Sequence, residues 1–138
     1  MTAGYSGTPL PRKLGIKEGH RIAVIGAPSG YPEGLGALPP GVDITTSARG
    51  RSDVILAFFE RRAALARRFA ALKRALPPAG GLWIAWPKRS SGVPTDLTED
   101  VVREIALAEG LVDNKVCAID ETWSGLRLVH RRENRPSR

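Results

Sequence analysis

This sequence of 138 residues has one cysteine, Cys117, and no apolar run near the roughly 20 residues that a membrane span needs. A single cysteine excludes a disulfide within the chain and a zinc site built on cysteine pairs. The first thirty residues lack the basic start and apolar middle of a signal peptide, and no internal repeat is visible. We therefore expect a cytoplasmic protein with no membrane partner.

Length and composition indicate one domain. The chain is 42% hydrophobic and 25% charged, which suits a single hydrophobic core. Glycine, proline, serine and threonine dominate the first residues, and arginine dominates the last ones. We predict a flexible N-terminal arm at 1–13, a single α/β domain at 14–131 and a basic disordered tail at 132–138.

The net charge of +7 is unevenly distributed along the chain. Residues 60–76 contribute +5 and residues 130–138 contribute +3, so the basic character belongs to one segment and the tail. A basic helix face is a candidate for binding nucleic acid. Because no recognition motif or interleaved aromatic residue accompanies it, we favour a solvated face. Nucleic acid remains an alternative partner, and its candidate residues are Arg61, Arg67, Arg68 and Arg74.

Three apolar runs, at 21–25, 53–58 and 82–86, are typical of parallel strands buried on both faces, and 42–45 is a weaker strand candidate. Glycines and prolines break up the stretch between the first run and the weak candidate, which leaves room for one short helix near 33–38. Trp83 and Trp86 lie three residues apart on one strand. Alternation therefore puts them on opposite faces, one in the core and one lining a cleft.

Two segments have the pattern of amphipathic helices. In residues 60–76, Leu65, Phe69, Leu72 and Leu76 repeat at steps that align them on one face, and two prolines end the segment. Asp96 followed by Glu99 resembles a capping box that begins a second helix, which ends at Gly110.

Strands at 115–119 and 126–130, joined by a turn, close the chain. The order of elements predicts an α/β fold with a mostly parallel Rossmann-like sheet, helices on its faces and a C-terminal antiparallel hairpin.

That closing hairpin, behind the strand that begins Gly80-Gly81-Leu82-Trp83-Ile84-Ala85, resembles the second half of a class I S-adenosylmethionine-dependent methyltransferase. The resemblance covers residues 14–131 and rests on element order. A finer resemblance is to a family of short uncharacterised bacterial proteins, a domain of unknown function. It is carried by Tyr5-Ser6-Gly7-Thr8-Pro9-Leu10, Trp86-Pro87-Lys88 and Asp120-Glu121-Thr122-Trp123-Ser124-Gly125-Leu126.

The methyltransferase resemblance implies an S-adenosylmethionine site with an acidic residue and a G-x-G turn at the first strand, and an acidic residue ending the second. Here the first turn, residues 26–30, has no carboxylate, and Pro28 removes an amide. Asp43 is the nearest acidic residue to the second position, and it falls near the start of the weak strand. We therefore expect no cofactor and no catalysis, with a minimal S-adenosylmethionine-dependent methyltransferase as the alternative.

The expected role is binding of a small anionic ligand or a protein partner at the carboxyl edge of the sheet, where open α/β sheets hold their ligands. Lys88 and Arg89 could hold an anion, and Trp123 could stack on a ring or simply close the hairpin. Alternatively, Lys88 forms an ion pair with Asp120 or Glu121 that fixes two loops. The candidate residues are Gly26, Ser29, Gly30, Tyr31, Lys88, Arg89, Ser90, Ser91, Asp120, Glu121 and Trp123.

The remaining reactive side chains point to no further chemistry. Ser29 does not lie in a G-x-S-x-G nucleophile elbow. His20 and His130 have no metal-type neighbours at ligand spacing, so we expect no metal. Cys117 lies in an apolar strand and is expected to be a buried small residue.

Overall fold

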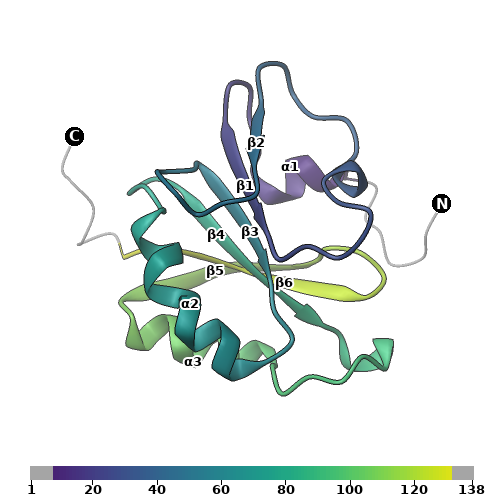
Figure 1. Cartoon of the computed structure of the whole chain (residues 1–138), viewed down its shortest axis with the longest axis vertical. Coiled ribbons are helices and arrows are strands. Elements are labelled where there is room, and N and C mark those ends of the chain that lie inside the picture. Colours follow the sequence, from purple (N-terminus) through teal and green to yellow (C-terminus); the bar gives the residue numbers. More distant parts are fainter. Residues whose placement is uncertain (1–7, 132–138) are drawn as a thin grey trace.

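The computed structural model describes residues 8–131, which form one six-stranded sheet covered on both faces (Figure 1). The strand order is β2-β1-β3-β4-β6-β5. The first four strands in this order are parallel, and β6 and β5 are antiparallel to their neighbours. The predicted fold class is confirmed. The strands are β1 Arg21–Ile25, β2 Asp43–Thr45, β3 Val54–Phe58, β4 Gly81–Pro87, β5 Leu111–Ala118 and β6 Trp123–His130.

Apolar runs predicted the central strands because both faces of the sheet are buried. In β1, Ala23 and Ile25 belong to one core cluster, whereas Ile22 and Val24 belong to the other. Every residue of β3 and β4 is buried. A strand in this position has no polar face, so it reads as a continuous apolar run.

Helices α2, Arg62–Arg74, and α3, Glu99–Ala108, cover the same face of the sheet (Figure 1). The predicted apolar stripe of α2 is confirmed, because Leu65, Phe69 and Leu72 are fully buried. The helix ends just before the two prolines, which cannot continue a helical hydrogen-bond pattern.

The predicted capping box at Asp96 is wrong. The N-cap of α3 is Thr98, whose Oγ1 accepts a hydrogen bond from the Val101 amide at 3.2 Å. Asp96 instead accepts one from the Arg62 amide at 2.6 Å, at the first turn of α2. A carboxylate near two helix starts can satisfy either one, and local sequence does not say which.

The opposite face of the sheet is covered by α1, Leu10–Leu14, the 3₁₀ turn η1, Glu33–Leu35, and the loops around them. Residues 10–13, which were predicted as part of a flexible arm, lie in helix α1, where Pro11 is buried, whereas Leu14 was correctly placed in the domain. A proline in the first helical turn lacks only an amide that the helix does not need. The arm's first seven residues and the predicted tail at 132–138 lie outside the described residues.

The two tryptophans of β4 face opposite sides, as predicted, but neither lines a cleft. Trp83 is 0% exposed and belongs to the cluster under α1, and Trp86 is 6% exposed in the cluster under α2 and α3. The Trp83 Nε1 donates to the Leu14 carbonyl at 3.0 Å, which ties α1 to the sheet.

Across residues 8–131, no helix combines the length and apolar character that crossing a bilayer requires.

Candidate functional site at the carboxyl edge

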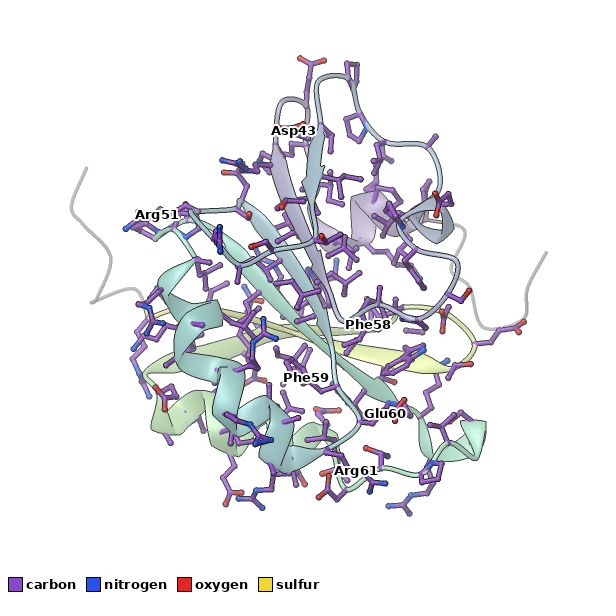
Figure 2. All side chains as sticks on the ribbon, viewed as in Figure 1. Asp43, Arg51, Phe58, Phe59, Glu60 and Arg61 are labelled. Atoms are coloured by element: carbon purple, nitrogen blue, oxygen red, sulfur yellow. The ribbon has the colours of Figure 1, made fainter. Side chains whose placement is uncertain are left out.

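The strand register brings the carboxyl ends of the parallel strands to one edge. Ile25 of β1 pairs with Ala57 of β3, and Phe58 pairs with Ala85 of β4. Pro87 at the end of β4 pairs with Trp123 at the start of β6. The loops that carry the predicted site residues therefore meet at this edge, around Phe58, Phe59 and Glu60 (Figure 2).

An aromatic cluster occupies one end of this edge. The ring centroids of Tyr31 and Phe58 are 5.1 Å apart, and those of Phe58 and Trp123 are 5.0 Å apart in an edge-to-face arrangement. Phe58 is 5% exposed and Trp123 is 7% exposed. Trp123 packs against Phe58, as in the hairpin-closing alternative, and its ring is not open for a ligand to stack on.

The Asp120 carboxylate holds the loops beside this cluster together. Its Oδ2 accepts a hydrogen bond from the Tyr31 hydroxyl at 2.7 Å. Its Oδ1 accepts from the amides of Thr122 and Trp123, both at 2.8 Å. Glu121, by contrast, is exposed. Adjacent carboxylates thus have different environments, and Asp120 is engaged in structure.

We predict that Tyr31→Phe lowers the free energy of unfolding by about 1–2 kcal/mol, because a part-buried carboxylate oxygen loses a hydroxyl donor. Urea unfolding followed by circular dichroism measures the change. Ser90→Ala, an exposed position on the same edge, is the matched hydroxyl deletion and is expected to leave stability unchanged. Equal stability of Tyr31→Phe and the native protein would contradict the role assigned to this bond.

Lys88 is joined to the turn through its backbone. The Lys88 amide donates to the Thr122 carbonyl at 2.8 Å, and none of the ion pairs within residues 8–131 includes Lys88. The predicted ion pair with Asp120 or Glu121 is therefore not formed, and the two loops are connected by this main-chain hydrogen bond instead.

The residues after Lys88 form the 3₁₀ turn η2, Arg89–Ser91. The Ser91 hydroxyl donates to the Lys88 carbonyl at 2.7 Å and accepts from the Val93 amide at 3.1 Å, so it shapes the turn. Arg89 and Ser90 are exposed at the same edge. Their side chains are accessible to a ligand, whereas Lys88 is half-buried.

The first turn brings bare backbone to the end of β3. Gly26 has φ +66°, and a Cβ added to it would lie 3.0 Å from the Phe58 carbonyl oxygen. Gly30 also has a positive φ, and Ser29 and Gly30 are exposed. A glycine at the first position is what this close approach requires.

Acidic groups lie elsewhere than the methyltransferase resemblance implies. Asp43 pairs with Arg21 at the start of β1, so it lies at the amino edge, away from the site. The end of β2 carries hydroxyls instead. Thr45 Oγ1 accepts from the Ser47 amide at 3.3 Å, and Ser47 Oγ accepts from the Arg49 amide at 3.1 Å, so each hydroxyl keeps its own hydrogen to donate.

Glu60 is a carboxylate that the sequence analysis did not single out. It is exposed and comes directly after Phe58 and Phe59 at the end of β3, the strand next to β1 (Figure 2). The Thr95 hydroxyl donates to its backbone carbonyl at 2.6 Å, which leaves the carboxylate itself at the surface. The sequence pattern that could have identified Glu60 is a single acidic residue between a buried strand and a basic helix.

The remaining reactive groups within the described residues form no metal site, since residues 8–131 hold no cluster of three or more metal-ligating side chains. His20 Nδ1 accepts from the Lys17 amide, and His130 Nε2 lies 3.1 Å from the Leu76 carbonyl oxygen. Cys117 is half-buried and not fully buried as expected, because β5 is an edge strand. Its partial burial raises the pKa of Cys117, and the charges of Lys13 and Lys115 offset part of that rise. The thiol therefore stays neutral near pH 7 and is a poor nucleophile.

The basic face of α2 is exposed, as the pattern predicts. Arg61, Arg67, Arg68 and Arg74 all lie at the surface. Exposure suits a solvated face and a nucleic-acid contact equally, so nucleic acid binding by these residues stays a prediction.

The fold of this chain is similar to those of solved structures, although no protein-family model and no curated protein matches its sequence. A methyltransferase dependent on S-adenosylmethionine from Aquifex aeolicus is 17% identical, with a TM-score of 0.61 over 85% of each chain. The magnesium protoporphyrin IX methyltransferase of Synechocystis, solved with bound S-adenosylmethionine, is 10% identical, with a TM-score of 0.59 over 83% of this chain and 71% of that one.

Fibrillarin from Aeropyrum pernix, in complex with natively bound S-adenosylmethionine, is 18% identical, with a TM-score of 0.58 over 91% of this chain and 70% of that one. At these identities the likeness concerns the fold. The chain has the class I methyltransferase fold.

Proposed function

We propose that this protein binds S-adenosylmethionine at the carboxyl edge of its sheet and is a minimal methyltransferase. The observation that carries the proposal is the likeness of fold over 83–91% of the chain to proteins whose structures hold this cofactor. It favours the alternative named in the sequence analysis over our expectation of a non-catalytic domain.

The uncharged features of the edge fit an adenosyl ligand. Gly26 exposes its backbone where β1 and β3 end side by side. The hydroxyl of Thr45, the last residue of β2, can exchange hydrogen bonds with a ribose hydroxyl. These two features support binding at the ends of β1 and β2.

Among the acidic residues Asp43, Asp120 and Glu60, Glu60 is the one placed to bind the cofactor. Asp43 lies at the other edge, and Asp120 is engaged by Tyr31 and by its own turn. Glu60 is exposed three residues after Ala57, the β3 residue that pairs with the end of β1, and can accept hydrogen bonds from the hydroxyl or ammonium groups of the cofactor. The bound cofactor supplies an electrophilic methyl group on its sulfonium, and the chain's part is to hold and orient it.

Calorimetric titration of the full chain with S-adenosylmethionine and S-adenosylhomocysteine tests this proposal. We predict measurable binding of both, and about tenfold weaker binding to Glu60→Gln, since one charge-assisted hydrogen bond contributes about 1.5–3 kcal/mol. Asp43→Asn removes the same charge at the opposite edge and is expected to bind like the native chain. A native chain that binds neither compound, or a Glu60→Gln variant that binds as tightly, would contradict the proposal.

Non-catalytic binding of a small anion or a protein is the second candidate. It is favoured by the buried aromatic cluster and the Tyr31–Asp120 bond, which occupy part of the edge with the protein's own side chains. Citrate binding that Arg89→Ala abolishes, with no response to S-adenosylmethionine, would favour this candidate.

A further inference from the structure

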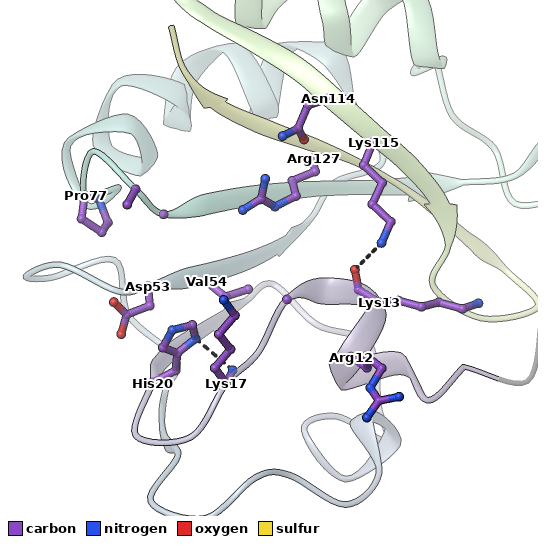
Figure 3. Close-up of a pocket in the computed structure, with 13 residues that line it drawn as sticks. Arg12, Lys13, Lys17, His20, Asp53, Val54, Pro77, Asn114, Lys115 and Arg127 are labelled. Carbon is purple, nitrogen blue, oxygen red and sulfur yellow. Dashed lines mark hydrogen bonds between the residues drawn. The ribbon is translucent and has the colours of Figure 1, made fainter. Parts of the chain in front are cut away.

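A second pocket lies at the opposite, amino edge of the sheet, with a volume of about 580 Å³ (Figure 3). Its walls come from α1 and the turn after it, the starts of β3 and β4, and the β5–β6 hairpin. Asp53 is the one acidic side chain in its lining, against five lysines and arginines. The cationic residues are Arg12, Lys13, Lys17, Lys115 and Arg127.

Three of these cations reach into the pocket from different segments. Figure 3 shows Arg127, Lys115 and Lys17 directed toward its interior, whereas Arg12 points away along the rim. Segments far apart in the sequence thus bring their charges to one concave surface, which is the arrangement expected of an anion site.

The Arg127 side chain packs against Gly81, where the absence of a side chain leaves space for the guanidinium. A Cβ added to Gly81 would lie 2.5 Å from the Arg127 Nε and 2.8 Å from its Nη2. The guanidinium therefore occupies the space that a side chain at position 81 would fill, and a glycine is the residue that leaves room for it there. A positioned guanidinium offers two parallel donors to a phosphate group.

Lys115 stands directly opposite Arg127 in the β5–β6 ladder, because the pairing shifts between Asp113 and Lys115. Two like charges directly opposite on neighbouring strands destabilise a sheet. An anion bound between them removes that repulsion. The Lys115 Nζ also donates to the Lys13 carbonyl at 3.1 Å, which connects the hairpin to α1 on the far wall.

The lone carboxylate of the pocket faces away from its interior. Asp53 Oδ2 accepts a hydrogen bond from the Arg21 amide at 2.8 Å, and Figure 3 shows Asp53 at the pocket's margin. This bond holds the Asp53 carboxylate at the start of β1, and the five cationic residues of the lining outweigh its single negative charge.

We propose that this pocket binds a small polyphosphate anion, that is, a ligand with two or more adjacent phosphate groups. Adjacent phosphates match one forked guanidinium and two ammonium groups that converge from three sides. The concave shape favours a small ligand over a nucleic-acid strand, which would need cations along a strip. The site is separate from the carboxyl edge and does not depend on cofactor binding there.

Titration of the full chain with inorganic tripolyphosphate, monitored by calorimetry, tests this proposal. We expect binding that weakens with salt, and at least tenfold weaker binding to Arg127→Gln. Lys115→Gln gives a second reading if the first variant does not fold. Arg62→Gln removes one charge from an exposed pair at the other edge and is the matched control. Both pocket variants are expected to bind S-adenosylhomocysteine like the native chain.

Two further ligands test whether the phosphate groups belong to a small molecule or to a nucleic-acid strand. ATP without a metal ion is expected to compete with tripolyphosphate, and a single-stranded RNA of about 12 nucleotides is expected to bind more weakly than either. Tripolyphosphate that does not bind, pocket variants that bind it as tightly as the native chain, or RNA that binds in preference to both phosphates would each overturn the proposal.

Discussion

Replacing Trp83 by alanine is expected to lower the free energy of unfolding by about 3–5 kcal/mol, the range for removing a large aromatic side chain from a core. Trp83 is 0% exposed and is among the largest fully buried side chains within residues 8–131. A domain of this kind has a total stability of about 5–15 kcal/mol. The substitution therefore brings the protein close to its unfolding threshold.

A second part of the effect comes from the hydrogen bond of Trp83 to the Leu14 carbonyl, which fixes α1. Trp83→Phe keeps most of the buried ring and removes this donor, so we expect it to cost about 1–3 kcal/mol through the unsatisfied carbonyl. Urea unfolding by circular dichroism measures both variants. Leu107→Ala, at a residue that is 44% exposed, is the control with no expected change. A loss below 1 kcal/mol for the alanine variant would contradict this account.

The sheet could be predicted from the sequence because its signal is local. Strands β1, β3 and β4 are apolar on both faces, and the stripe Leu65, Phe69 and Leu72 needs only helical periodicity to be recognised. Each element carries its own pattern, and the order of elements then limits the possible topologies.

Side chains that act across long sequence separations could not be predicted in this way. Asp96 caps a helix that begins 34 residues earlier, and Trp83 anchors a helix 69 residues away. Both bonds exist because the folded sheet brings the partners together. A local pattern such as Asp96 followed by Glu99 therefore indicates a helix start nearby without saying which residue caps it.

The cationic pocket is another feature that local sequence patterns could not predict. The sequence predicts an anion site at Lys88 and Arg89, which are adjacent in the chain. The pocket at the amino edge instead gathers Lys17, Lys115 and Arg127, which no sequence window contains together. Asp43 was correctly expected near the start of its strand, because a strand of three residues has its first residue at its amino end.

Gly26→Ala is expected to weaken binding of S-adenosylhomocysteine at least tenfold, provided that the cofactor binds where we propose. The added methyl group would lie 3.0 Å from the Phe58 carbonyl oxygen, so the ends of β1 and β3 must move apart. It also places alanine at φ +66°, a conformation that costs roughly 1–2 kcal/mol for a residue with a Cβ. Calorimetric titration measures the affinity, and urea unfolding measures the stability.

Gly19→Ala separates the two effects of that substitution. Gly19 has φ +76°, and a Cβ there meets nothing within 4 Å, so it carries the backbone strain without the contact. It precedes β1 and therefore lies at the other edge of the sheet. We expect Gly19→Ala to lower the free energy of unfolding by a similar amount, because alanine is again placed at a positive φ. We also expect it to bind S-adenosylhomocysteine like the native chain. If both variants bind it equally well, the bare backbone at Gly26 is not the contact that holds the cofactor.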